Sequence, residues 1–180
     1  NHELLLNQEI AMTEKTYNVL FLCTGNSARS IMAEALVTTL GNGRFKGYSA
    51  GSQPGGTVNP LALEKVQKTG YSLDKLRSKS WDEFARPNAP HMDFIITVCD
   101  NAAGEVCPIW PGHPASAHWS FQDPAAVEGT DDEKRAAFDK VFRQMATRMH
   151  AFISLPLHKL NNVAIQQEIR KIGDPSIVAI

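Results

Sequence analysis

Short apolar runs alternate with segments of helical periodicity along most of this chain. Residues 19–22, 45–50 and 94–98 have the pattern of buried strands, and a short fourth strand is predicted near 118–121. The helical pattern covers residues 31–40, 60–70, a short stretch within 77–84, and 131–152. Strands that alternate with helices indicate an α/β domain, in which a parallel sheet joined by right-handed crossovers carries helices on both faces.

Capping and breaking residues set the ends of these helices. Asn59 followed by Pro60 predicts a helix start, and Gly70 predicts its end. The acidic run at 131–133 complements the dipole of the long helix, which Pro156 terminates. We therefore expect a disordered N-terminal segment at residues 1–14, one domain at 15–156, and a helical tail at 157–180.

The most informative segment is residues 19–30, VLFLCTGNSARS, where a buried strand runs into a cysteine and an arginine follows six positions later. Cys23 and Arg29 then bracket the turn between a strand and a helix N-terminus. Backbone N–H groups there lack partners within the helix, so a tetrahedral oxyanion is stabilised inside the turn. Arg29 can hold two oxygens of such an anion, and its charge lowers the pKa of Cys23 toward a reactive thiolate.

The remaining turn residues suit a loop that wraps an anion. The expected oxyanion-binding set is Thr24, Gly25, Asn26, Ser27, Ala28, Arg29 and Ser30. Asn26 is expected to hold the turn through its side chain, and the serine hydroxyls could donate to the sulfur. The alternative is a core cysteine at a strand end and an arginine on a solvated helix face.

Composition is that of a single small domain in a reducing compartment. The chain has 180 residues, of which 43% are hydrophobic, and three cysteines, an odd number that favours the cytoplasm over a disulfide-stapled secreted fold. A net charge of −1 gives no general attraction to nucleic acid or to acidic membranes, and no apolar run approaches the roughly 20 residues that span a bilayer.

The loop at 23–29 resembles that of the low-molecular-weight protein tyrosine phosphatase family. The resemblance covers about residues 17–155 and implies a flavodoxin-like domain with four parallel strands around the Cys23 loop. The family contains both phosphatases and arsenate reductases, so other segments must distinguish the two reactions.

Two further cysteines favour the reductases. Cys99 follows the strand at 94–98, and Cys107 lies eight positions later across a loop that contains Gly104. A phosphatase needs one cysteine, whereas arsenate reduction takes two electrons, which a second thiol can supply by forming a disulfide with Cys23. The position of Cys99 also resembles that of the first resolving cysteine in thioredoxin-coupled reductases. The alternative is that Cys99 and Cys107 are small buried apolar residues.

The pair Asp123-Pro124 matches the acid loop of the family, which implies that Asp123 protonates the leaving group. Alone, an Asp-Pro pair is ordinarily a turn. The preceding His118 and Trp119 are similar to the reductase pattern, but no histidine has the spacing of a metal ligand.

Five residues fall where some reductases of the family bind a potassium ion near the loop: Asn26, Glu34, Ser49, Ser80 and Asp82. Scattered carboxylates and hydroxyls are otherwise surface groups or helix caps. A potassium ion is therefore an expectation from resemblance alone.

The sequence thus predicts arsenate reduction with no bound cofactor. Arsenate binds the loop, Cys23 attacks arsenic, and Asp123 protonates the departing hydroxyl. Cys99 then attacks the Cys23 sulfur as arsenite leaves, and Cys107 passes the disulfide outward. The expected external reductant is thioredoxin, and glutathione with glutaredoxin is the other route. A phosphotyrosine phosphatase that works through a phosphocysteine is the leading alternative, and a sensor of phosphate or arsenate is the more distant one.

Overall fold

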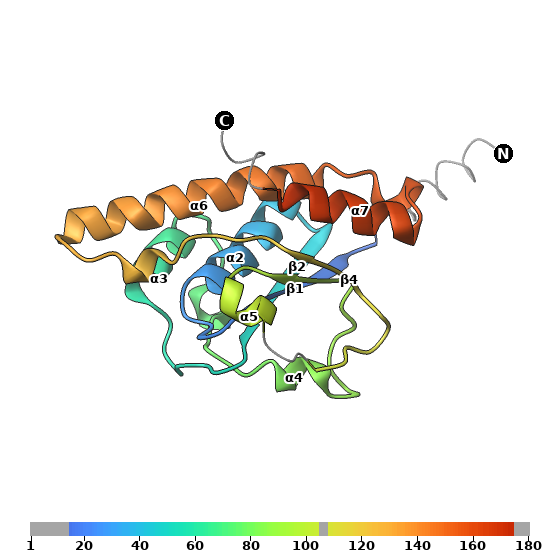
Figure 1. Ribbon diagram of the computed structural model, residues 1–180, viewed down its shortest axis with the longest axis horizontal. Helices are drawn as coiled ribbons and strands as arrows, with labels where there is room; N and C mark the ends of the chain where they lie inside the picture. Colours follow the sequence, from blue (N-terminus) through green and yellow to red (C-terminus); the bar gives the residue numbers. More distant parts are fainter. Residues whose placement is uncertain (1–14, 105–107, 175–180) are drawn as a thin grey trace.

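The computed structural model describes residues 15–104 and 108–174. Its centre is a four-stranded sheet in the order β2-β1-β3-β4, and every neighbouring pair of strands is parallel (Figure 1). The strands are β1 (Tyr17–Cys23), β2 (Phe45–Gly51), β3 (Phe94–Thr97) and β4 (Ala115–His118). The predicted α/β class with a four-stranded parallel sheet is confirmed.

Six α-helices and three short 3-10 helices connect or follow the strands in the described ranges. The α-helices are α2 (Arg29–Gly41), α3 (Pro60–Gln67), α4 (Asp82–Ala85), α5 (Asp100–Gly104), α6 (Asp131–Ile153) and α7 (Asn162–Ile172). The 3-10 helices are η1 (Leu73–Lys75), η2 (Pro124–Ala126) and η3 (Leu157–Lys159). In this part of the chain no helix combines the length and the apolar character needed to cross a membrane.

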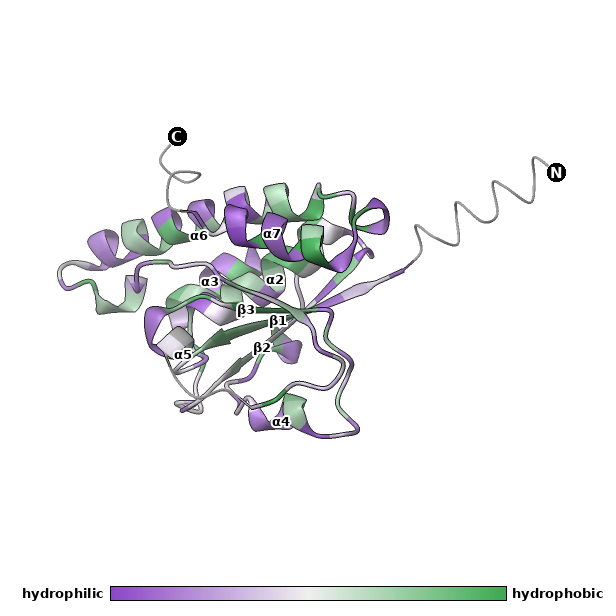
Figure 2. Cartoon of the chain, turned by 45° about the vertical axis from the view of Figure 1, so that its right-hand side comes forward, coloured by the Kyte–Doolittle hydropathy of each residue, from purple (hydrophilic) through white to green (hydrophobic). Residues whose placement is uncertain are grey.

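The two faces of the sheet are covered unequally. Val19 and Phe21 point into the larger core, where α2, α3, α6 and α7 pack, whereas Leu20 and Leu22 meet Trp81 and the residues around α4. Figure 1 shows the long helices on one side of the sheet and the short α4 on the other. The strands at the centre are green in Figure 2, as expected for a sheet buried on both faces.

The predicted start of α3 is present, whereas α3 ends at Gln67, before the predicted end at Gly70. Asn59 accepts a hydrogen bond from the Leu61 N–H at 2.8 Å, and Pro60 is the first residue of α3. The acidic run lies in the first turn of α6, as expected. Thr130 caps this helix in addition, because its hydroxyl accepts from the Glu133 N–H at 3.1 Å, a contact that was not predicted.

The fourth strand lies earlier than predicted. β4 pairs Ala115 with Phe94 and His118 with Thr97, so that only its last residue falls within the predicted range 118–121. Trp119 is fully buried after the chain has left the sheet, and its Nε1 donates to the Ile169 carbonyl at 2.9 Å. The buried aromatic residues of the segment after β4 have the apolar pattern of a strand, which explains the misplaced prediction.

The tail helix α7 packs against β4 and α6. Ser116 N–H donates to Gln166 Oε1 at 3.0 Å, and Ile169 and Ile172 are buried in the larger core. The segment after Cys99 also differs from the prediction, because α5 occupies most of the expected loop. Cys107 and residues 1–14 lie outside the described residues.

Candidate active site

The loop between β1 and α2 begins at Cys23 and ends at Arg29, as predicted. Its carbonyl groups accept hydrogen bonds from backbone N–H groups outside the loop: Cys23 from Ser52 at 3.3 Å, Thr24 from Gln53 at 3.0 Å, Gly25 from Gly55 at 3.1 Å, and Ser27 from Asn59 at 2.8 Å. In a trans peptide the next N–H points opposite to the carbonyl. The N–H groups that follow these carbonyls are therefore directed away from the surrounding segments, toward the side that receives an anion.

Asn26 fixes the shape of the loop from within. It is fully buried and has a left-handed backbone with φ of 46°, which asparagine tolerates better than most residues. Its Oδ1 accepts from the Lys79 N–H at 2.9 Å, and its Nδ2 donates to Ser30 Oγ at 2.9 Å. Ser30 thus supports the turn from its buried side.

Gly51, at the end of β2, allows the loop to approach the sheet. A Cβ at this position would collide with the Thr24 carbonyl oxygen. The segment that contains Ser78 and Lys79 closes the other side, because Ser78 Oγ donates to the Gly25 carbonyl at 3.0 Å and Gly51 N–H donates to the Lys79 carbonyl at 2.9 Å. The loop is held on two sides before any ligand binds.

Arg29 connects the loop to the candidate acid. Its Nη1 donates to the Phe121 carbonyl at 3.0 Å, and its Nη2 lies 3.7 Å from Asp123 Oδ2. Asp123 also caps η2, where its Oδ1 accepts from the Ala125 N–H at 3.0 Å. The structure therefore brings Cys23, Arg29 and Asp123 to one site from three separate elements.

Cys23 and Cys99 meet at the carboxyl edge of the sheet, where β1 and β3 end side by side. Both cysteines are buried, and their thiols hydrogen-bond one another. That contact, with burial and the charge of the neighbouring sulfur, raises the pKa of Cys23, although Arg29 and the Thr24 N–H oppose the rise. The same contact lowers the pKa of Cys99 to about 5.

The hydrogen bonds that stabilise a thiolate converge on Cys99. The Cys23 thiol is the largest contribution, and the Ala102 N–H and both polar groups of Thr24 add to it, against the cost of burial. Thr24 Oγ1 lies 3.7 Å from Cys99 Sγ. The sequence predicts a lowered pKa at Cys23, whereas beside the Cys99 sulfur the pKa of Cys23 is raised and that of Cys99 is lowered. Local sequence could not predict this, because the contact joins two strands.

A buried cluster of polar side chains lies behind the loop, on α2, β2 and the segment before α4. Glu34 Oε1 accepts from Ser49 Oγ at 2.7 Å, and Glu34 Oε2 accepts from the Tyr71 hydroxyl at 2.6 Å. The Lys79 ammonium lies 3.9 Å from Glu34 Oε1, and donates to Ser49 Oγ at 3.5 Å and to the Arg77 carbonyl at 3.0 Å. Burial raises the pKa of Glu34 and lowers that of Lys79. Hydrogen bonds from Tyr71 and Ser49 oppose the shift of Glu34, and the attraction between Glu34 and Lys79 opposes both shifts.

Three of the five residues of the predicted potassium site contact Lys79. Glu34 and Ser49 meet around the ammonium of Lys79, and Asn26 is engaged by the Lys79 backbone and Ser30. Ser80 Oγ instead accepts from the N–H of the exposed Asp82 at 3.2 Å. Lys79, which the sequence analysis did not single out, supplies positive charge beside the Glu34 carboxylate.

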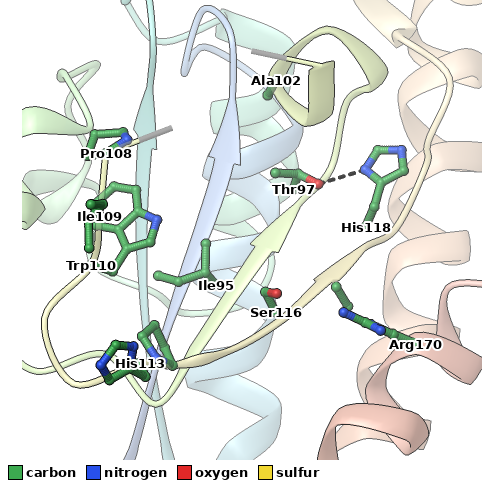
Figure 3. A pocket seen from close by; sticks show the side chains of 12 residues that line it. Ile95, Thr97, Ala102, Pro108, Ile109, Trp110, His113, Ser116, His118 and Arg170 are labelled. Atoms are coloured by element: carbon green, nitrogen blue, oxygen red, sulfur yellow. Dashed lines mark hydrogen bonds between the residues drawn. The ribbon is translucent and has the colours of Figure 1, made fainter. Parts of the chain in front are cut away.

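A cavity of about 620 Å³ lies beside the end of β4. His118 is one of the residues that line it (Figure 3). His118 Nδ1 lies 2.7 Å from Thr97 Oγ1, and His118 Nε2 lies 2.8 Å from Asp100 Oδ1. Ser120 Oγ donates to the same carboxylate oxygen at 3.0 Å. These contacts lie outside the anion loop but adjoin Cys99.

The site combines a strand-to-helix loop that starts at Cys23 and ends at Arg29 with Asp123 and a second buried cysteine, Cys99. Such a combination is typical of cysteine-dependent enzymes that act on tetrahedral oxyanions. Residues 18–167 match the family described as low molecular weight phosphotyrosine protein phosphatase. The chain is 38% identical over 134 residues to an arsenate reductase of Halalkalibacterium halodurans, covering 74% of this chain and 93% of that protein. An arsenate reductase of Bacillus subtilis is 37% identical over the same shares.

Solved structures agree with the sequence comparison. An arsenate reductase in an oxidised state has a TM-score of 0.60 at 25% identity, covering 76% of this chain and 96% of that chain, and one in a reduced state has a TM-score of 0.59 at 26% identity, covering 77% and 97%. The chain belongs to the low molecular weight phosphotyrosine protein phosphatase family. Within it, the chain belongs with the arsenate reductases.

Proposed function

We propose that this chain reduces arsenate through an arsenic adduct on Cys23 that the Cys99 thiolate resolves. One structural relationship carries the proposal: Cys99 is buried beside Cys23 where β1 and β3 end side by side, and the interaction of the two sulfurs lowers the pKa of Cys99 to about 5. A phosphatase that works through a phosphocysteine has no use for a second thiolate at this place. The reductases among the relatives of the chain support the same assignment.

The first step forms the adduct. Arsenate binds inside the loop between Cys23 and Arg29. The Arg29 guanidinium then leaves Asp123 and binds two oxygens of the arsenate. The Cys23 proton passes to an oxygen of the substrate, so that Cys99 remains a thiolate, and the Cys23 sulfur bonds arsenic as one oxygen departs. Asp123 protonates that oxygen, which leaves as water.

The second step transfers two electrons. The Cys99 thiolate attacks the Cys23 sulfur, so that a sulfur–sulfur bond forms as the sulfur–arsenic bond breaks. The bonding electron pair remains on arsenic, which changes from arsenic(V) to arsenic(III) and leaves as arsenite. Two thiols are thereby oxidised to one disulfide.

The third step passes the disulfide outward. Cys107 attacks Cys99, a Cys99–Cys107 disulfide forms, and Cys23 regains its electron pair. A dithiol protein of the thioredoxin class then reduces that disulfide, and glutathione with glutaredoxin is the alternative donor. Position supports this order, because Cys107 follows Cys99 by eight residues.

We also propose that the loop accepts phosphate, because phosphate and arsenate have nearly the same shape and charge. A solved arsenate reductase that is 25% identical is described in a phosphate-binding state, with a TM-score of 0.55 over 77% of this chain and 97% of that one. Phosphate should therefore compete with arsenate.

A separate proposal concerns the buried polar cluster around Glu34. We propose that the Lys79 ammonium supplies the positive charge there in place of a potassium ion. Its buried ammonium already lies among oxygens of Glu34, Ser49 and the Arg77 carbonyl. Replacing potassium chloride by choline chloride at constant ionic strength should leave the rate of arsenate reduction unchanged. A strong potassium requirement of the unaltered protein would contradict this assignment.

A single-turnover experiment tests the adduct route. The Cys107→Ser variant, mixed with arsenate and no external thiol, should release one arsenite per chain and acquire a Cys23–Cys99 disulfide that peptide mass spectrometry identifies. The matched Cys99→Ser variant should release none. Arsenite release from Cys99→Ser in a single turnover, or a disulfide that omits Cys99, would contradict the proposal.

A further inference from the structure

His118 and Asp100 form a contact that the reaction steps above leave unused. His118 is the last residue of β4, and Asp100 is the first residue of α5, directly after Cys99. His118 Nε2 lies 2.8 Å from Asp100 Oδ1, which also accepts from Ser120 Oγ at 3.0 Å. The contact thus ties the start of α5 to the end of the sheet.

The histidine ring is itself held on its other side. His118 Nδ1 lies 2.7 Å from Thr97 Oγ1, the dashed contact in Figure 3, and Thr97 pairs with His118 across β3 and β4. With Nε2–H donating to the carboxylate, Nδ1 accepts from the threonine hydroxyl in the neutral ring. The ring therefore has one orientation, set by two strands, from which it reaches Asp100.

The structure describes α5 over five residues, Asp100–Gly104. Helices shorter than about 12–15 residues are marginal in isolation, so tertiary contacts at Asp100 help to maintain this segment. The Ala102 N–H of this helix hydrogen-bonds the Cys99 sulfur and contributes to its low pKa. If α5 loosens, the sulfur loses that donor.

The Asp100 carboxylate also affects Cys99 through its charge. Hydrogen bonds from His118 and Ser120 and the charge of Arg29 lower the pKa of Asp100, although it is exposed, so that it is an anion near the Cys99 thiolate. Like charges disfavour each other. The two hydrogen bonds direct the carboxylate toward β4.

We propose that His118, acting through Asp100, is a positioning residue that keeps α5 folded against the sheet and so maintains the Cys99 nucleophile. The inference rests on the proposed relay, in which Cys99 attacks the Cys23 sulfur and arsenic takes up the electron pair. His118 exchanges no proton with the substrate in this role. Its contribution is confined to the second step.

The test compares His118→Ala with Ser116→Ala in a Cys107→Ser background. Ser116 lies two positions before His118 on β4 and lines the same cavity, and its backbone rather than its side chain bonds Gln166. Titration calorimetry with inorganic phosphate reports on the loop, which all variants should retain. Quenched single turnovers with arsenate report on Cys23–Cys99 disulfide formation.

We expect His118→Ala to bind phosphate like the parent but to form the disulfide roughly tenfold more slowly. The ultraviolet absorbance of the thiolate should show its low-pH midpoint moved upward from about 5, since Cys99 keeps Cys23 and Thr24 but loses the fixed Ala102 donor. Ser116→Ala should change neither readout. A parental rate and midpoint in His118→Ala, or equal slowing in Ser116→Ala, would overturn the proposal.

A variant of Asp100 tests the same contact if His118→Ala does not fold. Asp100→Ala removes the other partner of the contact from an exposed position and should slow the disulfide step by a similar factor. The double variant, if it folds, should be no slower than Asp100→Ala alone, because that substitution already removes the partner of His118. Additive slowing would overturn the proposal. If the parent releases no arsenite, the relay fails, and the thiolate titration of the variants still decides the role of His118.

Discussion

Arg29 Nη2 lies 3.7 Å from Asp123 Oδ2, so the anion-binding cation and the candidate acid are already paired in the unliganded site. The guanidinium is largely buried, with 15% of the side chain exposed, and is also anchored by the Phe121 carbonyl. In the proposed mechanism an arriving oxyanion replaces the carboxylate on Arg29, and Asp123 then protonates the oxygen that leaves.

Replacing Asp123 by Asn should separate binding from chemistry. The amide cannot supply a proton, so the rate of arsenate reduction should fall about 100-fold or more. The affinity for phosphate should not fall, because Arg29 loses a competing carboxylate. Steady-state kinetics and phosphate calorimetry on the same preparation provide the comparison, and an unchanged turnover number would remove Asp123 from the mechanism.

Arg29→Lys tests the geometry of anion recognition. A lysine keeps the charge but cannot present two parallel donors to the anion or reach both Phe121 and Asp123 in the same way. We expect a loss of about 100-fold in kcat/KM for arsenate, in the range for removal of a donor that stabilises a developing anion. The parent and Asp123→Asn serve as references, and a loss of only about twofold would show that charge alone is sufficient.

The pH dependence of the thiol pair follows from the direction of its two pKa shifts. In the Cys107→Ser background, the ultraviolet absorbance should indicate one thiolate at neutral pH, which protonates only as the pH falls through about 5. The folded-state pKa of Cys99 lies below the free-cysteine value of about 8.5. Its contribution to stability is therefore present above about 8.5 and lost as the pH falls through about 5.

Cys23, whose pKa is raised, contributes in the opposite sense: its stabilisation is present below the free-cysteine value and is lost at higher pH. Cys99→Ser in the same background removes the neighbouring sulfur, so the pKa of Cys23 should fall, because only burial then opposes Arg29 and the Thr24 N–H. If both thiols of the Cys107→Ser protein titrate independently near 8.5, the two cysteines do not shift each other's pKa, which would contradict the account.

Lys79 and Glu34 should show strong coupling in stability. Lys79→Met removes the ammonium but leaves a buried carboxylate, which should lower the free energy of unfolding by about 3 kcal/mol. In the Glu34→Gln background the same substitution should cost much less, because no buried charge is abandoned. Urea unfolding of the four proteins measures the cycle, and equal costs in both backgrounds would exclude the ion pair as the cause.

The sequence contains enough local signals to predict much of this site. Cys23 and Arg29 are defined by the end of a strand and the start of a helix, and Cys99 follows a strand that pairs directly with β1. Neighbouring parallel strands end at the same edge of a sheet, which is why the two thiols could be expected near each other.

What could not be predicted depends on contacts between distant segments. Lys79 stands among charged and polar residues and resembles a surface lysine, yet the bridge between Gly51 and Ser80 draws its segment against β2 and buries it. The link from His118 to Asp100 requires the true end of β4, which the aromatic residues after it concealed. The direction of the pKa shift at Cys23 depends on Cys99, which the local loop does not contain.

The most direct test of the central claim is arsenate-dependent oxidation of NADPH, coupled through thioredoxin and thioredoxin reductase, measured for the unaltered protein and for Cys99→Ser. Turnover by the former and none by the latter, which still binds phosphate, is the predicted result. Full turnover by Cys99→Ser would contradict the claim that Cys99 resolves the adduct on Cys23.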